Sequence, residues 1–209
     1  MCPPDELCSS EAVRQLYGEP SHLSVAKELD RLDPHCRAFI KLSPFLVIAS
    51  ADAEGRCDAT PRGDAPGFVR IIDDKNLLIP DRKGNNRVDT LLNIAANPRA
   101  GLLFMVPGID ETLRVNGKVT LTTDAALLAP LTVDGKLPKS GILMTIEEVY
   151  FQCAKALIRS KLWAPESRVE RKSFPSLGQI LADQIRAGEA KDGTHLDRLI
   201  TERYKTGLY

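Results

Sequence analysis

Apolar residues change their spacing twice along the chain, from a helical period to short strand-like runs and back again. Between Phe45 and Phe151, runs of apolar residues are separated by brief turns that contain Gly, Pro, Asn or Asp. Such runs predict β-strands, and connections of hairpin length favour antiparallel pairing. Every second residue from Leu113 to Leu121 lies on one face, as in a half-buried strand. About seven strands are therefore expected, interrupted by a single well-formed helix.

The segments on both sides of this β region keep helical spacing. We therefore expect an N-terminal helical segment at residues 1–43, a β domain at 44–165 and a C-terminal helical tail at 166–209. A small barrel is the simplest arrangement of the strands, because closure removes exposed strand edges. The expected fold class is mainly β with flanking helices, α+β.

Composition limits the classes of function. The chain has 209 residues, 43% of them hydrophobic, which is enough for one sizeable core. It has 28 basic and 28 acidic residues, so no net charge marks a whole surface for nucleic acid or an anionic membrane. Any anion site must be local. No apolar stretch approaches the roughly 20 residues of a membrane-spanning helix, and no secretory signal is present, so we expect a cytoplasmic protein.

No metal site is predicted. The five cysteines are widely and irregularly spaced and lack the paired CxxC spacing that zinc sites usually show. Cys36, Cys57 and Cys153 have apolar neighbours, so we expect them to be small core residues.

A polar turn joins a strand to a helix in "LLIPDRKGNNRVDTLLNI", Leu77–Ile94. If Asn86 caps the helix, Arg87 is its first residue, and the free backbone N–H groups attract an anion together with the helix dipole. Arg82 and Lys83 add positive charge. The spacing is not that of a Walker loop, which favours a phosphorylated cofactor over a hydrolysed nucleotide. The alternative is a solvated loop with an ordinary helix cap.

A second unusual run is "CAKALIRSKLW", in which Lys155, Arg159 and Trp163 recur at four-residue steps. On a helix these three side chains share one face. Two cations and an indole suit an anionic, aromatic ligand. The alternative is a surface helix with exposed cations and one core tryptophan.

Together with "ATPRGDAPGFVRI" upstream and the Asn-Pro-Arg that follows the helix, these runs resemble the pyridoxamine 5'-phosphate oxidase family of FMN-binding split-barrel proteins. The resemblance covers roughly Phe39 to Pro165. It implies an antiparallel, six- to seven-stranded split β-barrel of Greek-key type that binds FMN. It also implies a homodimer with FMN at the subunit interface and a small-molecule substrate.

The resemblance implies three groups of FMN-binding residues. Those at the strand-to-helix turn, which would hold the phosphate, are Arg82, Asn85, Asn86 and Arg87. Those along the barrel strands, near the flavin ring, are Thr60, Arg62, Gly63, Val69, Arg70, Ile79, Pro80 and Asp81. Those reaching the flavin from the partner subunit are Lys155, Arg159, Ser160 and Trp163. The sequence departs from the vitamin-forming oxidases at Asn86-Arg87 and in its helical tail, which argues against pyridoxamine phosphate as substrate.

The leading hypothesis is an FMN-dependent oxidoreductase acting on a small organic substrate, with Arg159 or Lys155 stabilising the negative charge of the reduced flavin. No catalytic side chain stands out. One alternative is a flavin-binding or sensing module without turnover, and another is a deazaflavin-dependent reductase on the same fold. Haem is disfavoured because the three histidines lie outside the β region.

Overall fold

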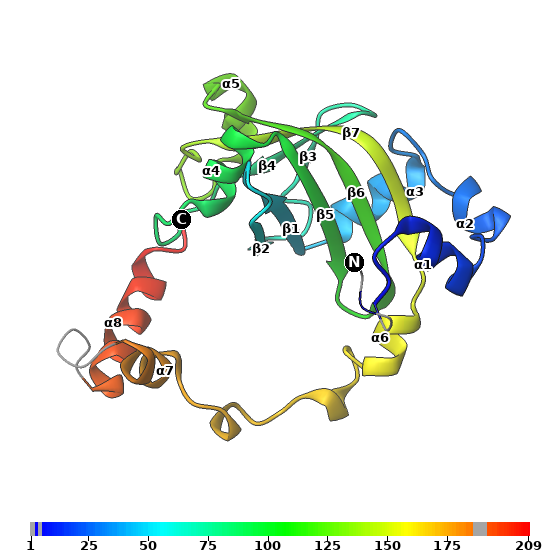
Figure 1. The fold of residues 1–209 in the computed structure, drawn as a ribbon. Coiled ribbons are helices and arrows are strands. Elements are labelled where there is room, and N and C mark those ends of the chain that lie inside the picture. Colours follow the sequence, from blue (N-terminus) through cyan, green and yellow to red (C-terminus); the bar gives the residue numbers. More distant parts are fainter. Residues whose placement is uncertain (1–2, 4–5, 186–191) are drawn as a thin grey trace.

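The computed structural model describes residue 3, residues 6–185 and residues 192–209 (Figure 1). Its strands are β1 (Phe45–Ala51), β2 (Cys57–Gly63), β3 (Arg70–Ile71), β4 (Asn76–Pro80), β5 (Arg99–Val106), β6 (Ile109–Thr122) and β7 (Gly141–Gln152). The α-helices in the described part are α1 (Ser10–Tyr17), α2 (His22–Ala26), α3 (Pro34–Leu42), α4 (Asp89–Ala96), α5 (Ala125–Leu128), α6 (Lys155–Ser160), α7 (Leu177–Gln184) and α8 (Gly193–Thr206).

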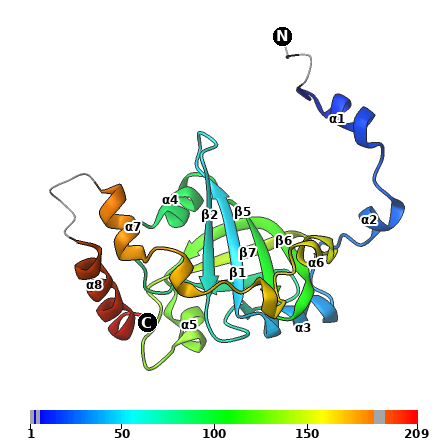
Figure 2. The ribbon, with the colours of Figure 1, turned by 90° about the horizontal axis from the view of Figure 1, so that it is seen from below.

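The seven strands form one antiparallel sheet in the order β2-β1-β5-β6-β7-β4-β3. The edge strands β2 and β3 do not pair with each other in the described residues, so the sheet is not closed. One hydrophobic core nevertheless takes side chains from β1 and from β4, which lie near opposite edges. The sheet must therefore curl around that core (Figures 1 and 2). The predicted mainly β, split-barrel fold is confirmed.

Helix α3 closes one side of this core. Asp33 caps the helix, with its Oδ1 accepting the Cys36 N–H at 2.7 Å, and Pro34 stands in its first turn. Cys36, Phe39 and Ile40 are buried among the barrel residues. Each fully buried large apolar side chain stabilises the fold by about 1.5–3 kcal/mol.

Two of the three cysteines predicted to be core residues are exposed. Cys36 is buried, but the prediction was wrong for Cys57 and Cys153. Cys57 begins the edge strand β2, and Cys153 follows the last residue of β7, so both lie at strand ends and not in the core.

The long strand β6, which pairs with β7, contains the predicted alternation. Leu113, Val115 and Val119 are fully buried, whereas Leu121 at the strand end is exposed. The register of the two strands shifts between Asn116 and Gly117. A Cβ at Gly117 would lie 2.1 Å from the Thr145 carbonyl oxygen, so glycine lets the two backbones approach at this bulge.

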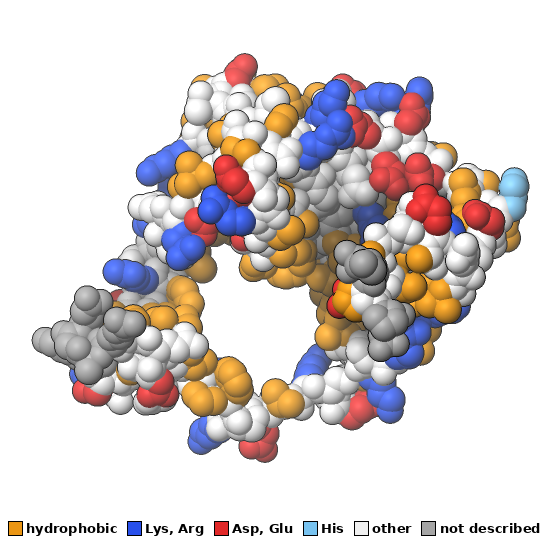
Figure 3. All heavy atoms as spheres, in the orientation of Figure 1, with side chains coloured by type: hydrophobic (Ala, Val, Ile, Leu, Met, Phe, Trp, Pro, Cys, Tyr) orange, Lys and Arg blue, Asp and Glu red, His pale blue; other side chains and the backbone are white. Residues whose placement is uncertain are grey.

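The C-terminal tail forms a helix pair of its own. Helices α7 and α8 pack together where the Gly178 N–H donates to Asp197 Oδ1 at 2.8 Å. In the described chain beyond Arg168, the hydrogen bonds that reach the barrel are those of Tyr209. An open gap separates the middle of the tail from the barrel (Figures 1 and 3).

The N-terminal helices also stand apart. Neither α1 nor α2 buries a residue, and Figure 2 shows α1 well away from the barrel. Within the described part of the chain, no helix combines the length and the apolar composition that crossing a membrane requires.

Candidate functional site

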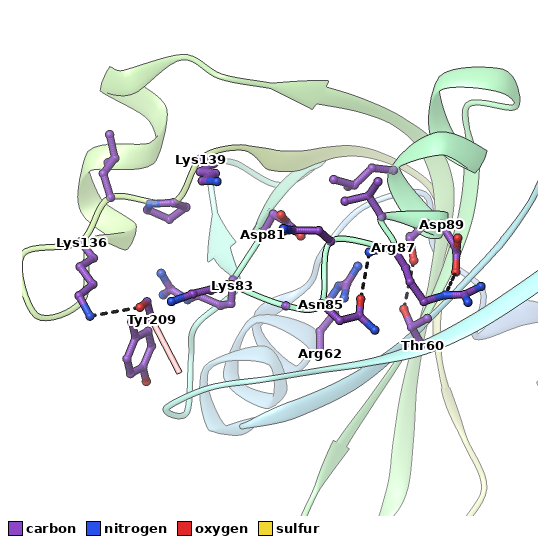
Figure 4. A pocket seen from close by; sticks show the side chains of 18 residues that line it. Thr60, Arg62, Asp81, Lys83, Asn85, Arg87, Asp89, Lys136, Lys139 and Tyr209 are labelled. Atoms are coloured by element: carbon purple, nitrogen blue, oxygen red, sulfur yellow. Dashed lines mark hydrogen bonds and ion pairs between the residues drawn. The ribbon is translucent and has the colours of Figure 1, made fainter. Parts of the chain in front are cut away.

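A cavity of about 680 Å³ lies at one end of the barrel (Figure 4). Its walls come from β2, the turn after β4, the start of α4, the loop before β7, and Tyr209 from the end of the tail. The predicted site residues on its wall are Thr60, Arg62, Asp81, Arg82, Asn85, Asn86 and Arg87. The structure thus joins the polar turn to the strand that contains "ATPRG".

The turn between β4 and α4 differs from the expected one. The predicted N-cap at Asn86 was wrong: α4 begins at Asp89, and Val88 holds the cap position without a side-chain hydrogen bond. Asn85 explains the delay, because its Oδ1 accepts the Arg87 N–H at 3.0 Å and forms a local turn two residues ahead of the helix.

Two residues in this turn have left-handed backbone conformations, Asn86 with φ 62° and Val88 with φ 52°. Asparagine tolerates this region, whereas a β-branched valine adopts it rarely. The left-handed conformation costs about 1–2 kcal/mol for a residue with a Cβ. Such strain is found most often at ligand-binding sites, and here it lies on the cavity wall.

Arg62 is the most unusual polar residue of the cavity. Its Nε is buried and has no hydrogen-bond partner within the described residues. Burial raises the pKa of the nearby Asp81 carboxyl, and the positive charges of Arg62 and Lys139 oppose that rise. A buried donor without a partner is unfavourable by about 1–3 kcal/mol. No protein group in the described residues offsets this penalty.

Thr60 joins β2 to α4 through a chain of hydroxyl groups. The Thr90 hydroxyl donates to Asp58 Oδ2 at 2.8 Å, and the Thr60 and Thr90 Oγ1 atoms are 3.2 Å apart. Since each hydroxyl has one proton, Thr60 must be the donor in that second contact. Thr60 therefore presents only its lone pairs to the cavity in this arrangement.

Arg82, also on the cavity wall, is fixed by two hydrogen bonds of its guanidinium. Its Nε donates to Asp64 Oδ2 at 2.6 Å and its Nη1 to the Leu131 carbonyl at 2.8 Å. Tyr209 Oη donates to Asp64 Oδ1 at 2.7 Å, and the Arg82 guanidinium lies 5.5 Å from the centre of the Tyr209 ring. Burial tends to raise the pKa of Asp64, but hydrogen bonds from Tyr209, the Ala65 N–H and Arg82 lower it overall.

Five other predicted residues do not line the cavity: Gly63, Val69, Arg70, Ile79 and Pro80. Val69 and Ile79 point into the barrel core, and Pro80 is also buried. The Arg70 Nη1 donates to the Leu127 carbonyl at 3.0 Å. In the described structure, neither β3 nor β4 contributes a residue to the cavity wall, and from β2 only Thr60 and Arg62 line it.

The third predicted group lies elsewhere on the chain. Lys155, Arg159, Ser160 and Trp163 do not line the cavity; α6 packs against β6 near the opposite end of the barrel (Figure 1). The expected shared helical face was wrong for Trp163, because Lys161 has φ 51° and ends the helix. Trp163 instead packs back, with its Nε1 donating to the Ile109 carbonyl at 2.9 Å.

Sequence reasoning missed several cavity residues. Lys136, Lys139 and Tyr209 line the wall together with Lys83, which the turn motif included only as a source of charge. "DGKLPKS" has two lysines around a proline, which is a weak signal, and Tyr209 lies 145 positions from its partner Asp64. No histidine lines the cavity in the described structure, and no group of metal-ligating side chains occurs there.

Residues 32–153, more than half of the chain, match the family model described as pyridoxamine 5'-phosphate oxidase. The chain belongs to this family. The match begins before α3, runs through the barrel and includes most of the cavity-lining residues of this pyridoxamine 5'-phosphate oxidase family member.

Solved structures give weaker likenesses. The HupZ protein of Group A Streptococcus aligns at 18% identity and TM-score 0.48, over 57% of this chain and 93% of that one. An F420 reductase aligns at 15% identity and TM-score 0.42, over 56% of this chain and 94% of that one. A pyridoxamine 5'-phosphate oxidase-related, FMN-binding protein of Nostoc punctiforme aligns at 16% identity and TM-score 0.37, over 55% of this chain and 81% of that one. No curated protein matches the sequence.

Proposed function

We propose that this chain is a flavin mononucleotide-dependent oxidoreductase that acts on a small organic substrate. The observation that carries the proposal is the cavity at the end of the barrel, where the buried Arg62 Nε has no partner. A volume of about 680 Å³ is within the range of roughly 300–1,000 Å³ for small-molecule sites. Family membership supports the same assignment.

Arg62, Asn85 and the first backbone N–H groups of α4 would hold the cofactor phosphate. The Arg62 side chain lies on the cavity wall and no hydrogen bond within the described residues holds its guanidinium, and the turn at Asn85–Val88 brings the helix start to the same wall. A helix N-terminus and an arginine both favour a phosphate dianion. Arg82 is less available, since its Nε and Nη1 are already bonded.

Arg87 would provide a more adjustable contact. Its side chain is 74% exposed, and its Nε donates to Asp89 Oδ2 at 2.8 Å. An exposed ion pair of this kind contributes about 0–1 kcal/mol, so Arg87 can turn to a phosphate at little cost. Arg87 therefore stays in the proposed site, with Arg62 as the stronger anchor.

The ring-binding side of the site would be completed by a second subunit. Lys155, Arg159, Ser160 and Trp163 lie away from the cavity of their own chain, so they would contact the flavin only across a homodimer interface. When bound, the flavin supplies the hydride-transfer chemistry, while the protein provides binding, orientation and charge.

Purification followed by an absorbance spectrum tests the cofactor. A flavin spectrum, in the protein as isolated or after incubation with FMN and gel filtration, is the expected result. Protein that stays colourless after incubation with excess FMN would overturn the proposal, and a deazaflavin or haem spectrum would replace FMN. Anaerobic addition of NADH or NADPH then separates an oxidoreductase, whose flavin is bleached, from a binding module, whose flavin no donor reduces.

A further inference from the structure

The cavity carries more positive charge than one phosphate requires. Two carboxylates on its wall, Asp81 and Asp89, face six cations. The cations are Arg62, Arg82, Lys83, Arg87, Lys136 and Lys139. Arg82 is paired with Asp64 and Arg87 with Asp89, which leaves Arg62 and the three lysines against Asp81 alone. A phosphate monoester carries about −1.5 to −2, so its binding would still leave positive charge uncompensated.

The excess charge is concentrated at one end of the cavity. Lys83, Lys136 and Lys139, here called the lysine end, lie on the same side of the view as Tyr209, whereas Arg87, Asp89 and Thr60 lie on the opposite side (Figure 4). Within the described structure, Lys83 and Lys139 make no hydrogen bond or ion pair. The lysine end therefore has donors that the proposed phosphate contacts do not use.

An oxygen atom of the chain already occupies the lysine end. Lys136 Nζ donates to the main-chain oxygen of Tyr209 at 3.1 Å. The Tyr209 ring lines the cavity and stacks near Arg82. The last residues of the tail thus hold the position that an anionic oxygen of a ligand would take.

Tyr209 can leave without exposing an unpaired buried charge. Asp64 would keep the Arg82 Nε at 2.6 Å and the Ala65 N–H at 2.7 Å. Arg82 would keep the Leu131 carbonyl. Because Asp64 and Arg82 keep these partners, exchange of Tyr209 for a ligand removes one hydrogen bond to Asp64, one to Lys136 and the ring contact with Arg82.

We propose that the lysine end is a second anion-binding subsite, which binds a carboxylate or phosphate group of the substrate in exchange for the end of the tail. The inference rests on the proposed function for the adjacent FMN, and it narrows the substrate to a small organic anion. Tyr209 then acts as a displaceable plug that occupies the subsite until the substrate binds.

Calorimetric titration of the full chain with phenyl phosphate, a small aromatic anion, tests the subsite. With FMN bound first, wild-type protein is expected to bind the probe. The Lys136→Gln, Lys139→Gln double variant should bind it at least about tenfold more weakly, since hydrogen bonds to charged groups are lost. The exposed lysines Lys41 and Lys172 provide the matched control, and their double Gln variant should bind like wild type.

Tyr209→Phe gives a second, opposite expectation. The variant keeps the ring but loses the hydrogen bond to Asp64, so the plug is weaker and the probe should bind several-fold more tightly. Equal probe affinity in wild type and the Lys136/Lys139 variant would overturn the subsite, and so would the absence of probe binding to the wild type.

The two proposals fail separately. If FMN does not bind, the same titration is made on the cofactor-free protein with Arg62→Gln as an added variant. Probe binding that needs the lysines but not Arg62 supports the subsite while the FMN proposal fails. Probe binding that needs Arg62 and not the lysines overturns the subsite.

Discussion

Arg62 is the cavity-lining side chain with a buried, unpaired donor in the described structure. Its buried Nε has no partner, and the Asp81 carboxyl beside it has a pKa raised by burial. A buried donor without an acceptor is unfavourable. Arg62 lies on the cavity wall and no hydrogen bond holds its guanidinium within the described residues, so its remaining N–H groups can turn to an anion.

Replacing Arg62 with Gln is expected to weaken FMN binding by about 10- to 100-fold, because a charge-assisted hydrogen bond to phosphate is lost. The free energy of unfolding without FMN should fall by less than about 1 kcal/mol, since the native Nε makes no hydrogen bond. Fluorescence titration with FMN and urea unfolding measure the two quantities. Arg56→Gln is the control, because the Arg56 side chain is 79% exposed and lies in the β1–β2 turn. Unchanged FMN affinity in Arg62→Gln would remove Arg62 from the site.

Asp64 gives a pH-dependent prediction. Its pKa is lowered in the folded protein, so its stabilising effect is fully present above about pH 4–5, where the unfolded chain is also ionised. The effect is lost as the pH falls through the lowered folded-state pKa. Asp64→Asn should therefore destabilise the protein by about 1–3 kcal/mol at pH 7, and the difference from wild type should shrink below pH 4. Urea unfolding of both proteins at pH 7 and below pH 4 measures this difference in the free energy of unfolding. A difference that stays constant between them would contradict the assignment.

The sequence predicted the residues of the cavity wall only in part. Arg62, Thr60 and Asp81 follow from the family resemblance, and the polar turn follows from its own composition. The sequence did not predict which of Arg62 and Arg87 is held more firmly in the proposed site, because that depends on burial in the folded protein. The Arg62 Nε is buried, whereas the Arg87 side chain is mostly exposed. Lys136 and Lys139 had no pattern that distinguishes them from other surface lysines.

At the scale of elements, local signals predicted the strands and hairpins well. The alternation in β6 and the short polar turns depend on residues that are close together in the chain, so the sequence pattern predicts them directly. Helix ends were less predictable. The left-handed Val88 and Lys161 set the start of α4 and the end of α6, and neither residue type favours that conformation. Both side chains are exposed, and the turn at Lys161 is held by local backbone hydrogen bonds, from the Lys161 N–H to the Ile158 carbonyl and from the Leu162 N–H to the Leu157 carbonyl.

Gly117→Ala tests the bulge at which the register of the β6–β7 pair shifts. The added Cβ would lie 2.1 Å from the Thr145 carbonyl oxygen, so the strands must separate. We expect a loss of about 1–3 kcal/mol, or roughly 3–10 °C in the melting temperature. Gly84→Ala is the control, because no atom lies within 4 Å of its added Cβ and its stability should change by less than about 0.5 kcal/mol. Equal melting temperatures for the two variants would show that the backbone approach is looser than described.

At the scale of the molecule, the barrel was predictable and the path of the tail was not. The core collects residues that the sequence already marks as apolar strands. The contact of Tyr209 with Asp64 spans 145 residues and depends on how α7 and α8 are carried back to the cavity. Nothing in the local pattern of "RYKTGLY" predicts that return.

The proposed interface predicts the mass in solution. Light scattering after gel filtration should give twice the chain mass of 23.0 kDa, because the residues of α6 would reach the proposed flavin only across two subunits. Arg159→Gln should weaken FMN binding and leave that mass unchanged. A protein that binds FMN tightly as a monomer would contradict the shared site.

The most direct test of a phosphate-anchored flavin site is the affinity ratio of FMN to riboflavin, which lacks the phosphate. The wild-type protein should bind FMN at least about 100-fold more tightly than riboflavin, since two or more charge-assisted hydrogen bonds depend on the phosphate. In Arg62→Gln the ratio should fall below about tenfold. Equal affinities for FMN and riboflavin in the wild type, or no binding of either, would contradict the assignment of this cavity.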